Sequence, residues 1–184
     1  MVEENEEMLV EKAKEDPEAF GVLYEKYVRR IYSYIYRRTG SRHDAEDLTS
    51  RTFHRALANI DRYENKGLPF SAWLYRIAHN LLANWLRDRS RHPVISLDEW
   101  ALTRQRGRSS VPEHQAGANE EREALLEAIK RLPADRQQLL ILKLMEGMSN
   151  VEIGQVLGRS VGAIKSLYFR ILIALREDLE KRGF

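Results

Sequence analysis

SNVEIGQVLGRSVGAIKSLYFR, at residues 149–170, is the stretch that decides the fold, because it has the pattern of a helix-turn-helix. Ser149 is a favourable N-cap residue, and Glu152 follows three residues later as its partner in a capping box. Gly158 stands where a helix end favours left-handed backbone, and Ser160 is placed to cap the next helix. The stretch therefore predicts two helices joined by a tight turn.

The second of these helices has two chemically different faces. At about 100° per residue, one face is apolar and should be buried: Ile164, Leu167, Tyr168, Ile171 and Leu175. The opposite face carries small, basic, hydroxyl and aromatic residues: Gly162, Lys165, Ser166, Phe169 and Arg170. Lysine and arginine can bind guanine edges or phosphates, serine can bind either, and phenylalanine can contact a thymine methyl. This face predicts binding in a DNA major groove. The alternative is a solvated helix on which Phe169 packs against a neighbour.

Composition excludes several classes of protein. The chain has 184 residues and 43% hydrophobic content, which suffice for one domain or two small ones. It has no cysteine, so disulfides and thiolate metal sites are excluded. No run of about 18 apolar residues is present, and the acidic N-terminus does not resemble a signal peptide. These features predict a cytoplasmic protein without membrane insertion.

The net charge of +2 conceals an uneven distribution along the chain. Acidic residues dominate the first eighteen positions, whereas residues 29–42 and 87–108 are rich in arginine. An acidic beginning followed by basic patches is typical of a chain that binds a polyanion and also contacts protein.

Helical patterns cover most of the chain, and strand patterns are nearly absent. Asp16 and Pro17 begin one helix, which Gly40 ends. Ser41, with Asp44 three residues on, opens another that runs to about Ile60. Residues 61–68 are polar and contain Gly67, which predicts a loop. A long helix then follows from Pro69 to about Arg91.

The periodicity fails from His92 to Ala118, where proline, glycine and serine accumulate. A segment this long is uncommon within a compact domain and predicts a tether. Helical pattern resumes near Asn119, breaks at Leu132-Pro133 and stops near Gly147. We therefore predict an all-α fold of two small helical domains, at 1–91 and 119–184, joined by a flexible linker at 92–118.

The helix beginning at Phe70 carries a second candidate surface. Its apolar stripe should be core: Phe70, Leu74, Ile77, Ala78, Leu81 and Trp85. Beside that stripe lies a flank of aromatic, amide and basic residues: Trp73, Arg76, Asn80, Asn84 and Arg87. The preceding loop adds Tyr63, Asn65 and Lys66. This mixture can stack an unpaired base, neutralise phosphates and contact a base edge. The alternative is a half-buried Trp73 among solvated arginines.

Two other helices have simpler explanations. On the helix at 43–60, one side should be buried: Ala45, Thr49, Thr52, Phe53, Ala56 and Ile60. Exposed polar residues occupy the opposite side, and acidic residues near a helix start are usually just favourable for its dipole. On the helix at 17–39, five tyrosines alternate with arginines, and we expect core tyrosines and solvated arginines there.

Three blocks of sequence resemble the bacterial sigma factors of the sigma-70 family. DAEDL at 44–48, followed by Thr52-Phe53 and Arg55-Ala56-Leu57, is similar to their polymerase-binding helix. Phe70, WLYRIA at 73–78 and Asn80 resemble the adjacent promoter-melting segment. The promoter-reading domain is matched at Leu132-Pro133, 140–144, 147–149, Glu152-Ile153, Leu157-Gly158, Gly162 and Lys165-Ser166. Their order and spacing resemble the two-domain, extracytoplasmic-function group.

The resemblance assigns roles to three sets of residues. It implies contact with the clamp helices of the largest RNA polymerase subunit by Asp44, Glu46, Asp47, Arg51 and His54. It implies binding of the non-template minus-ten strand, with a flipped base, by Tyr63, Asn65, Lys66, Trp73, Arg76, Asn80, Asn84 and Arg87. It implies recognition of the minus-thirty-five duplex by Arg159, Ser160, Gly162, Lys165, Ser166, Phe169 and Arg170. The polymerase flap region and an anti-sigma factor are further implied partners.

Two departures from the family pattern bear on these roles. Arg51 stands where the family commonly has an acid, which reverses the charge at one point of the expected polymerase face. Leu167 replaces a common arginine, and its helical angle predicts a core position rather than a phosphate contact.

Two rival functions make different predictions. A stand-alone regulator with a sensory N-terminal domain would bind DNA without polymerase, usually as a dimer, and would contain a ligand pocket. A helical adaptor would not depend on Lys165 or Arg170. Neither catalytic residues nor a cofactor site is expected. The five histidines lack metal-binding spacing, so no metal is expected.

Overall fold

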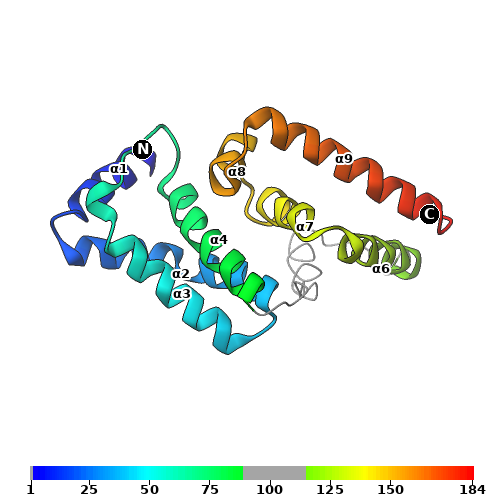
Figure 1. Cartoon of the computed structure of the whole chain (residues 1–184), viewed down its shortest axis with the longest axis horizontal. Helices are drawn as coiled ribbons and strands as arrows, with labels where there is room; N and C mark the ends of the chain where they lie inside the picture. The colour runs from blue at the N-terminus through cyan, green and yellow to red at the C-terminus, as the bar shows by residue number, and fades with distance from the viewer. Residues whose placement is uncertain (1, 89–114) are drawn as a thin grey trace. The chain divides into compact units, whose positions relative to one another are not determined.

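The computed structural model describes residues 2–88 and 115–184, and every regular element within them is helical (Figure 1). The prediction of an all-α fold is therefore confirmed. The described residues form two compact units: α1 to α4 lie in the N-terminal unit, and α6, α7, α9 and the first part of α8 lie in the C-terminal unit. Most of the predicted linker, residues 92–114, lies outside the described residues.

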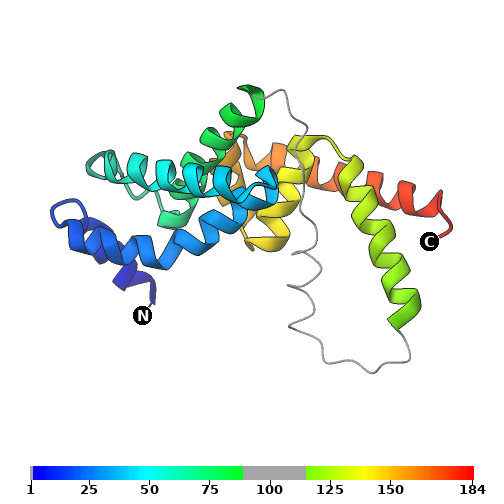
Figure 2. The ribbon, with the colours of Figure 1, turned by 90° about the horizontal axis from the view of Figure 1, so that it is seen from below.

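The N-terminal unit is a small helical bundle. Its elements are α1 (Val2–Lys12), α2 (Pro17–Thr39), α3 (Arg42–Leu57), the 3₁₀ turn η1 (Ile60–Arg62) and α4 (Phe70–Asp88). The long helices α2, α3 and α4 pack against one another, and α1 packs against α2 and α4 (Figure 2). The loop between η1 and α4 contains the polar residues that the sequence placed near DNA.

Local capping sets the helix boundaries, as predicted. The Asp16 side chain accepts a hydrogen bond from the Glu18 amide at 2.9 Å, directly before Pro17. Gly40 ends α2 with a left-handed φ of 61°. The Ser41 hydroxyl accepts from the Asp44 amide at 3.3 Å. Each cap satisfies a backbone group that the helix itself leaves without a partner.

Two features of this unit differ from the prediction, and a third cannot be compared with it. α1 forms in the acidic segment, for which the sequence offered no helical pattern. The helix expected to reach Ile60 ends at Leu57, and η1 takes up the first part of the predicted loop. α4 is described only to Asp88, so its expected continuation to Arg91 lies outside the described residues.

The core of this unit combines aliphatic side chains with tyrosines. Tyr27 and Tyr34 are buried, which confirms the expected core role for part of the tyrosine-rich helix, whereas Tyr24 is exposed. Arg38 departs from the prediction, because it is only 3% exposed rather than solvated. Helical angle alone could not reveal this, because it does not show that His79 of α4 lies near Arg38.

A half-buried histidine lies beside this arginine. The Tyr34 hydroxyl is 3.5 Å from Nδ1 of His79, which α4 contributes. Burial, and then the nearby charge of Arg38, lower the pKa of His79 to about 4. His79 is therefore neutral near neutral pH.

This histidine should make the stability of the N-terminal unit depend on pH. The unfolded chain takes up the proton near pH 6.5, whereas the folded chain resists it down to about pH 4. Stability should thus be complete above pH 6.5 and should fall as the pH drops toward 4. The loss amounts to about 3 kcal/mol at most, and His79→Gln should flatten it. Urea titrations of the full chain, followed by NMR amide signals of α4, would measure this. An equally steep loss in His79→Gln would assign the pH dependence to other groups.

The C-terminal unit contains the predicted helix-turn-helix. Its elements are α6 (Gln115–Arg131), α7 (Ala134–Leu140), the π-helical turn η3 (Ile141–Met145), α8 (Asn150–Leu157) and α9 (Val161–Glu180). α6 and α7 both pack against α9. Residues 115–118, which were expected to belong to the linker, are already helical.

The break at Leu132-Pro133 is confirmed, and one side chain fixes its geometry. The Gln137 amide nitrogen donates to the carbonyls of Ile129, Lys130 and Leu132 at 3.1, 2.8 and 2.8 Å. These carbonyls lie at the end of α6, where the helix itself leaves most carbonyls without a partner. Of the three, the Ile129 carbonyl also accepts from the Leu132 amide at 3.1 Å. Gln137 is only 3% exposed, so a buried side chain fixes the bend between α6 and α7.

Candidate functional site

The helix-turn-helix forms through the predicted caps. The Ser149 amide donates to the Glu152 carboxylate at 2.7 Å, and the Glu152 amide donates to the Ser149 hydroxyl at 3.2 Å. Gly158 adopts a left-handed φ of 64° between the helices. The Ser160 hydroxyl accepts from the Ala163 amide at 3.2 Å. The capping box and the turn therefore fix where α9 begins.

The two faces of α9 separate as the sequence predicted. Its buried side consists of Ile164, Leu167, Ile171 and Leu175, with Tyr168 half-buried. Its other side exposes Gly162, Lys165, Ser166, Phe169 and Arg170. Phe169 is 65% exposed, which excludes the alternative that it packs against a neighbouring helix. Leu167 is buried, as expected from its helical angle.

The residues at the start of α9 are exposed, and one of them also caps the helix as predicted. Arg159, Ser160 and Gly162 are all exposed beside Lys165. The Ser160 hydroxyl is already bonded to the helix backbone, so its first role is to orient the helix. The Arg170 Nε donates to the Ser166 carbonyl at 3.4 Å, which keeps this guanidinium along the exposed face.

The flank of α4 also forms as predicted. Arg76, Asn80, Asn84 and Arg87 are all exposed, and Arg87 donates to the Asn84 side chain at 2.9 Å. Trp73 is half-buried, because its ring lies 5.4 Å from that of Phe70 between centroids. This exposure also matches the alternative explanation, because Trp73 is half-buried and the arginines are exposed. The exposed part of Trp73 still adjoins the basic and amide groups.

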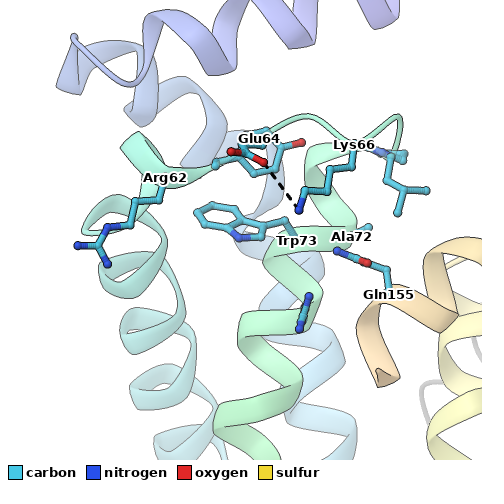
Figure 3. A pocket seen from close by; sticks show the side chains of 10 residues that line it. Arg62, Glu64, Lys66, Ala72, Trp73 and Gln155 are labelled. Carbon is cyan, nitrogen blue, oxygen red and sulfur yellow. Dashed lines mark ion pairs between the residues drawn. The ribbon is translucent and has the colours of Figure 1, made fainter. Parts of the chain in front are cut away.

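The loop before α4 differs more from the expectation. Tyr63 is only 8% exposed and meets Phe70 edge to face, with centroids 5.3 Å apart. The centroids of the Tyr63 and Trp73 rings are also 5.1 Å apart. Tyr63 therefore packs beneath the exposed surface and does not itself face solvent. Asn65 and Lys66 are exposed, and Lys66 pairs with Glu64 at 3.7 Å. Figure 3 shows the Trp73 ring between Arg62 on one side and Lys66 on the other.

Three polar residues extend this surface, although they were absent from the predicted set. Arg55, Asn59 and Arg62 line a hollow of about 320 Å³ together with Trp73, Ile77 and Asn80. Arg55 comes from α3, Asn59 is the residue before η1 and Arg62 ends η1, whereas the predicted flank belongs to α4. In the sequence, their spacing of four and then three residues was the signal that they share a surface. Only the packing of α3 against α4, however, brings them beside Trp73.

The expected polymerase face lies on α3. Glu46, Asp47, Arg51 and His54 are exposed, and Asp47 pairs with Arg51 at 3.5 Å. Asp44 is half-buried, because its carboxylate accepts from the Trp85 indole at 3.3 Å. Beside this face an apolar groove of about 520 Å³ runs between α2 and α3, lined by residues that include Tyr24, Tyr32 and Phe53.

Within the described residues, the structure has neither a metal-binding cluster nor a helix that could span a membrane. Histidine and acidic side chains do not gather anywhere in residues 2–88 or 115–184 into a group that could hold a metal ion. Within the same ranges, none of the helices has the length and apolar content that crossing a bilayer requires.

Comparison with known families matches both units. The family model for Sigma-70 region 2 matches residues 23–92, and the model for Sigma-70, region 4, matches residues 122–175. The ECF RNA polymerase sigma factor SigW of Bacillus subtilis is 34% identical over 94% of this chain and 98% of its own length. The ECF RNA polymerase sigma factor BldN of Streptomyces coelicolor is 38% identical over 91% of this chain. The chain spans 63% of the length of BldN.

A solved structure supports the fold. The sigma factor RpoE from Bartonella quintana, in complex with the anti-sigma factor NepR, aligns with a TM-score of 0.59 and 23% identity. The alignment covers 88% of this chain and 96% of that one.

Proposed function

Because this chain belongs to the extracytoplasmic-function group of the sigma-70 family, we propose that its two units bind two different states of promoter DNA. The chain is an RNA polymerase sigma factor that directs the core enzyme to promoters and aids their opening. The N-terminal unit would act on the opened minus-ten element, and the C-terminal unit on the minus-thirty-five duplex. Residues 92–118 would connect the two, although the last four of them are helical.

The observation that carries this proposal is the contrast between two exposed surfaces. On α9, Lys165, Ser166 and Arg170 form a convex helical face around Phe169, which suits insertion into a major groove. On α3 and α4, arginines and amides surround a hollow beside the half-buried Trp73 ring. A concave surface with an aromatic wall suits an unstacked base rather than a duplex.

Further partners follow from the family. We propose that the clamp helices of the largest polymerase subunit contact Asp44, Glu46, Asp47, Arg51 and His54. The apolar groove beside these residues would belong to the same interface. The flap region would contact the C-terminal unit, and an anti-sigma factor is a candidate regulator because RpoE is seen with one. The protein would act in the cytoplasm by binding alone, without catalysis.

Run-off transcription tests the proposal. Core polymerase alone should give no defined transcripts from a promoter library, whereas adding this chain should produce discrete start sites. A stand-alone regulator would instead bind its DNA without polymerase and would not co-purify with the core enzyme. Failure to confer start-site selection on a compatible core enzyme would reject the sigma-factor function.

Charge reversal on α3 should weaken binding to core polymerase. Glu46→Lys combined with Asp47→Lys replaces two exposed carboxylates on the proposed interface. We expect about five- to tenfold lower affinity for core enzyme, with the largest effect at low salt. Fluorescence anisotropy of labelled protein against core enzyme would measure it. Glu25→Lys, a single charge reversal at an exposed position of α2, is the control, and it is compared with Glu46→Lys and Asp47→Lys made separately as well as together. Equal affinity in all of these variants would remove the acidic residues of α3 from the interface.

A further inference from the structure

The acidic helix α1 makes a direct contact with the loop that precedes α4. The Asn65 side-chain amide donates to the Glu7 carboxylate at 2.5 Å, across 58 residues of sequence. The other end of the same amide accepts from the Gly67 backbone at 2.9 Å. Gly67 has a positive φ of 73°, which favours glycine. Asn65 is thus held from both ends in the middle of the loop.

A neighbouring residue fixes α1 itself. The Glu6 carboxylate accepts from the Tyr27 hydroxyl at 2.6 Å and also pairs with Lys26. Burial acts to raise the pKa of Glu6, but hydrogen bonds from Lys26, Tyr27 and the Phe70 backbone outweigh it and lower the pKa. Phe70 is the first residue of α4. Glu6 therefore ties α1 to α2 and to the residue where the loop ends.

We propose that Glu7 is a positioning residue for minus-ten recognition: it holds Asn65, and with it the loop at 63–68, in the geometry that receives an unpaired base. This inference rests on the function proposed above and assigns a role to α1, which the roles considered so far leave unused. Glu7 itself need not touch DNA. Its contribution is to order the loop in the free protein. The free energy of ordering the loop then does not reduce the affinity for DNA.

An opposite role for the same carboxylate makes a different prediction. A negative charge close to a DNA-binding loop could repel phosphates and restrain binding. The two roles respond differently to a neutral side chain that still accepts a hydrogen bond. Glutamine at position 7 keeps an acceptor for Asn65 and removes the charge, whereas alanine removes both.

The experiment compares Glu7→Ala, Glu7→Gln and Glu15→Ala in the full chain. Glu15→Ala removes an exposed carboxylate from the turn after α1 and controls for charge. Hydrogen exchange of the free protein should show the Gly67 amide exchanging about tenfold faster in Glu7→Ala. Holoenzyme carrying that variant should bind a minus-ten non-template oligonucleotide about five- to tenfold more weakly. Glu7→Gln and Glu15→Ala should resemble the unmodified protein in both measurements.

Two results would overturn the inference. Unchanged exchange at Gly67 in Glu7→Ala would show that the loop is held without this contact. Tighter oligonucleotide binding by both position-7 variants would show that the carboxylate repels DNA. If unmodified holoenzyme does not retain the oligonucleotide at all, the proposed function fails, while hydrogen exchange still decides whether Glu7 orders the loop.

Discussion

Lys165→Glu is expected to abolish promoter-dependent transcription while leaving the affinity for core polymerase unchanged. Lys165 is exposed on the α9 face that should enter the major groove, so its charge would lie among phosphates and base edges. The substitution removes a contact worth about 1–3 kcal/mol and adds repulsion from the backbone. We expect about a 100-fold loss or more in transcripts from a minus-thirty-five-dependent promoter, measured by run-off assay beside a core-polymerase pull-down.

Lys181→Glu is the matched control for this substitution. Lys181 is also exposed, and it directly follows α9 at the end opposite Lys165. It should leave transcription nearly unchanged, because it makes the same charge change away from the proposed groove contact. Loss of polymerase binding together with transcription in Lys165→Glu would contradict the division of roles between the units.

Asn80→Ala is expected to impair strand opening without affecting binding to the minus-thirty-five duplex. Asn80 lines the hollow beside Trp73, where its amide can bond to a base that has left the stack. Extruding a base costs a few kcal/mol, so a lost base contact shows most clearly in the opening step. We expect about a 10- to 100-fold decrease in permanganate reactivity near the start site.

A template with a preformed bubble provides the control for this prediction. Opening no longer has to be supplied by the protein on such a template, so Asn80→Ala should recover most of its transcription. Normal permanganate reactivity on duplex DNA would argue against a base-binding hollow at Asn80. A defect that persists on the bubble would instead indicate damage to polymerase binding or to the fold.

The features that the sequence predicted correctly are those determined within one or two helical turns. The caps at Asp16, Ser41 and Ser160, and the left-handed residues Gly40 and Gly158, depend on neighbours a few positions away. Helical angle likewise separated the buried and exposed sides of α9. The aromatic and basic flank of α4 followed from the same periodicity.

The features that the sequence missed depend on contacts between distant segments. Tyr63 is polar enough to suit an exposed loop, but Phe70 and Trp73 cover it. The buried Arg38 lies near the half-buried His79, although 41 positions separate them. Arg55, Asn59 and Arg62 reach the hollow only through the packing of α3 on α4. The helix α1 acquires its contacts from α2 and the loop, so its own pattern gave no indication of a role.

The bend that Gln137 fixes between α6 and α7 has a mechanical consequence. A bend secured by three carbonyl contacts to one buried side chain resists rotation better than a bare proline turn would. A pull on the chain ahead of α6 would therefore not be absorbed at Pro133. The force would be transmitted along α6 to α7. Because α6 and α7 both pack against α9, it would also reach α9. A displacement of α6 would therefore also move the helix that we propose to enter the major groove.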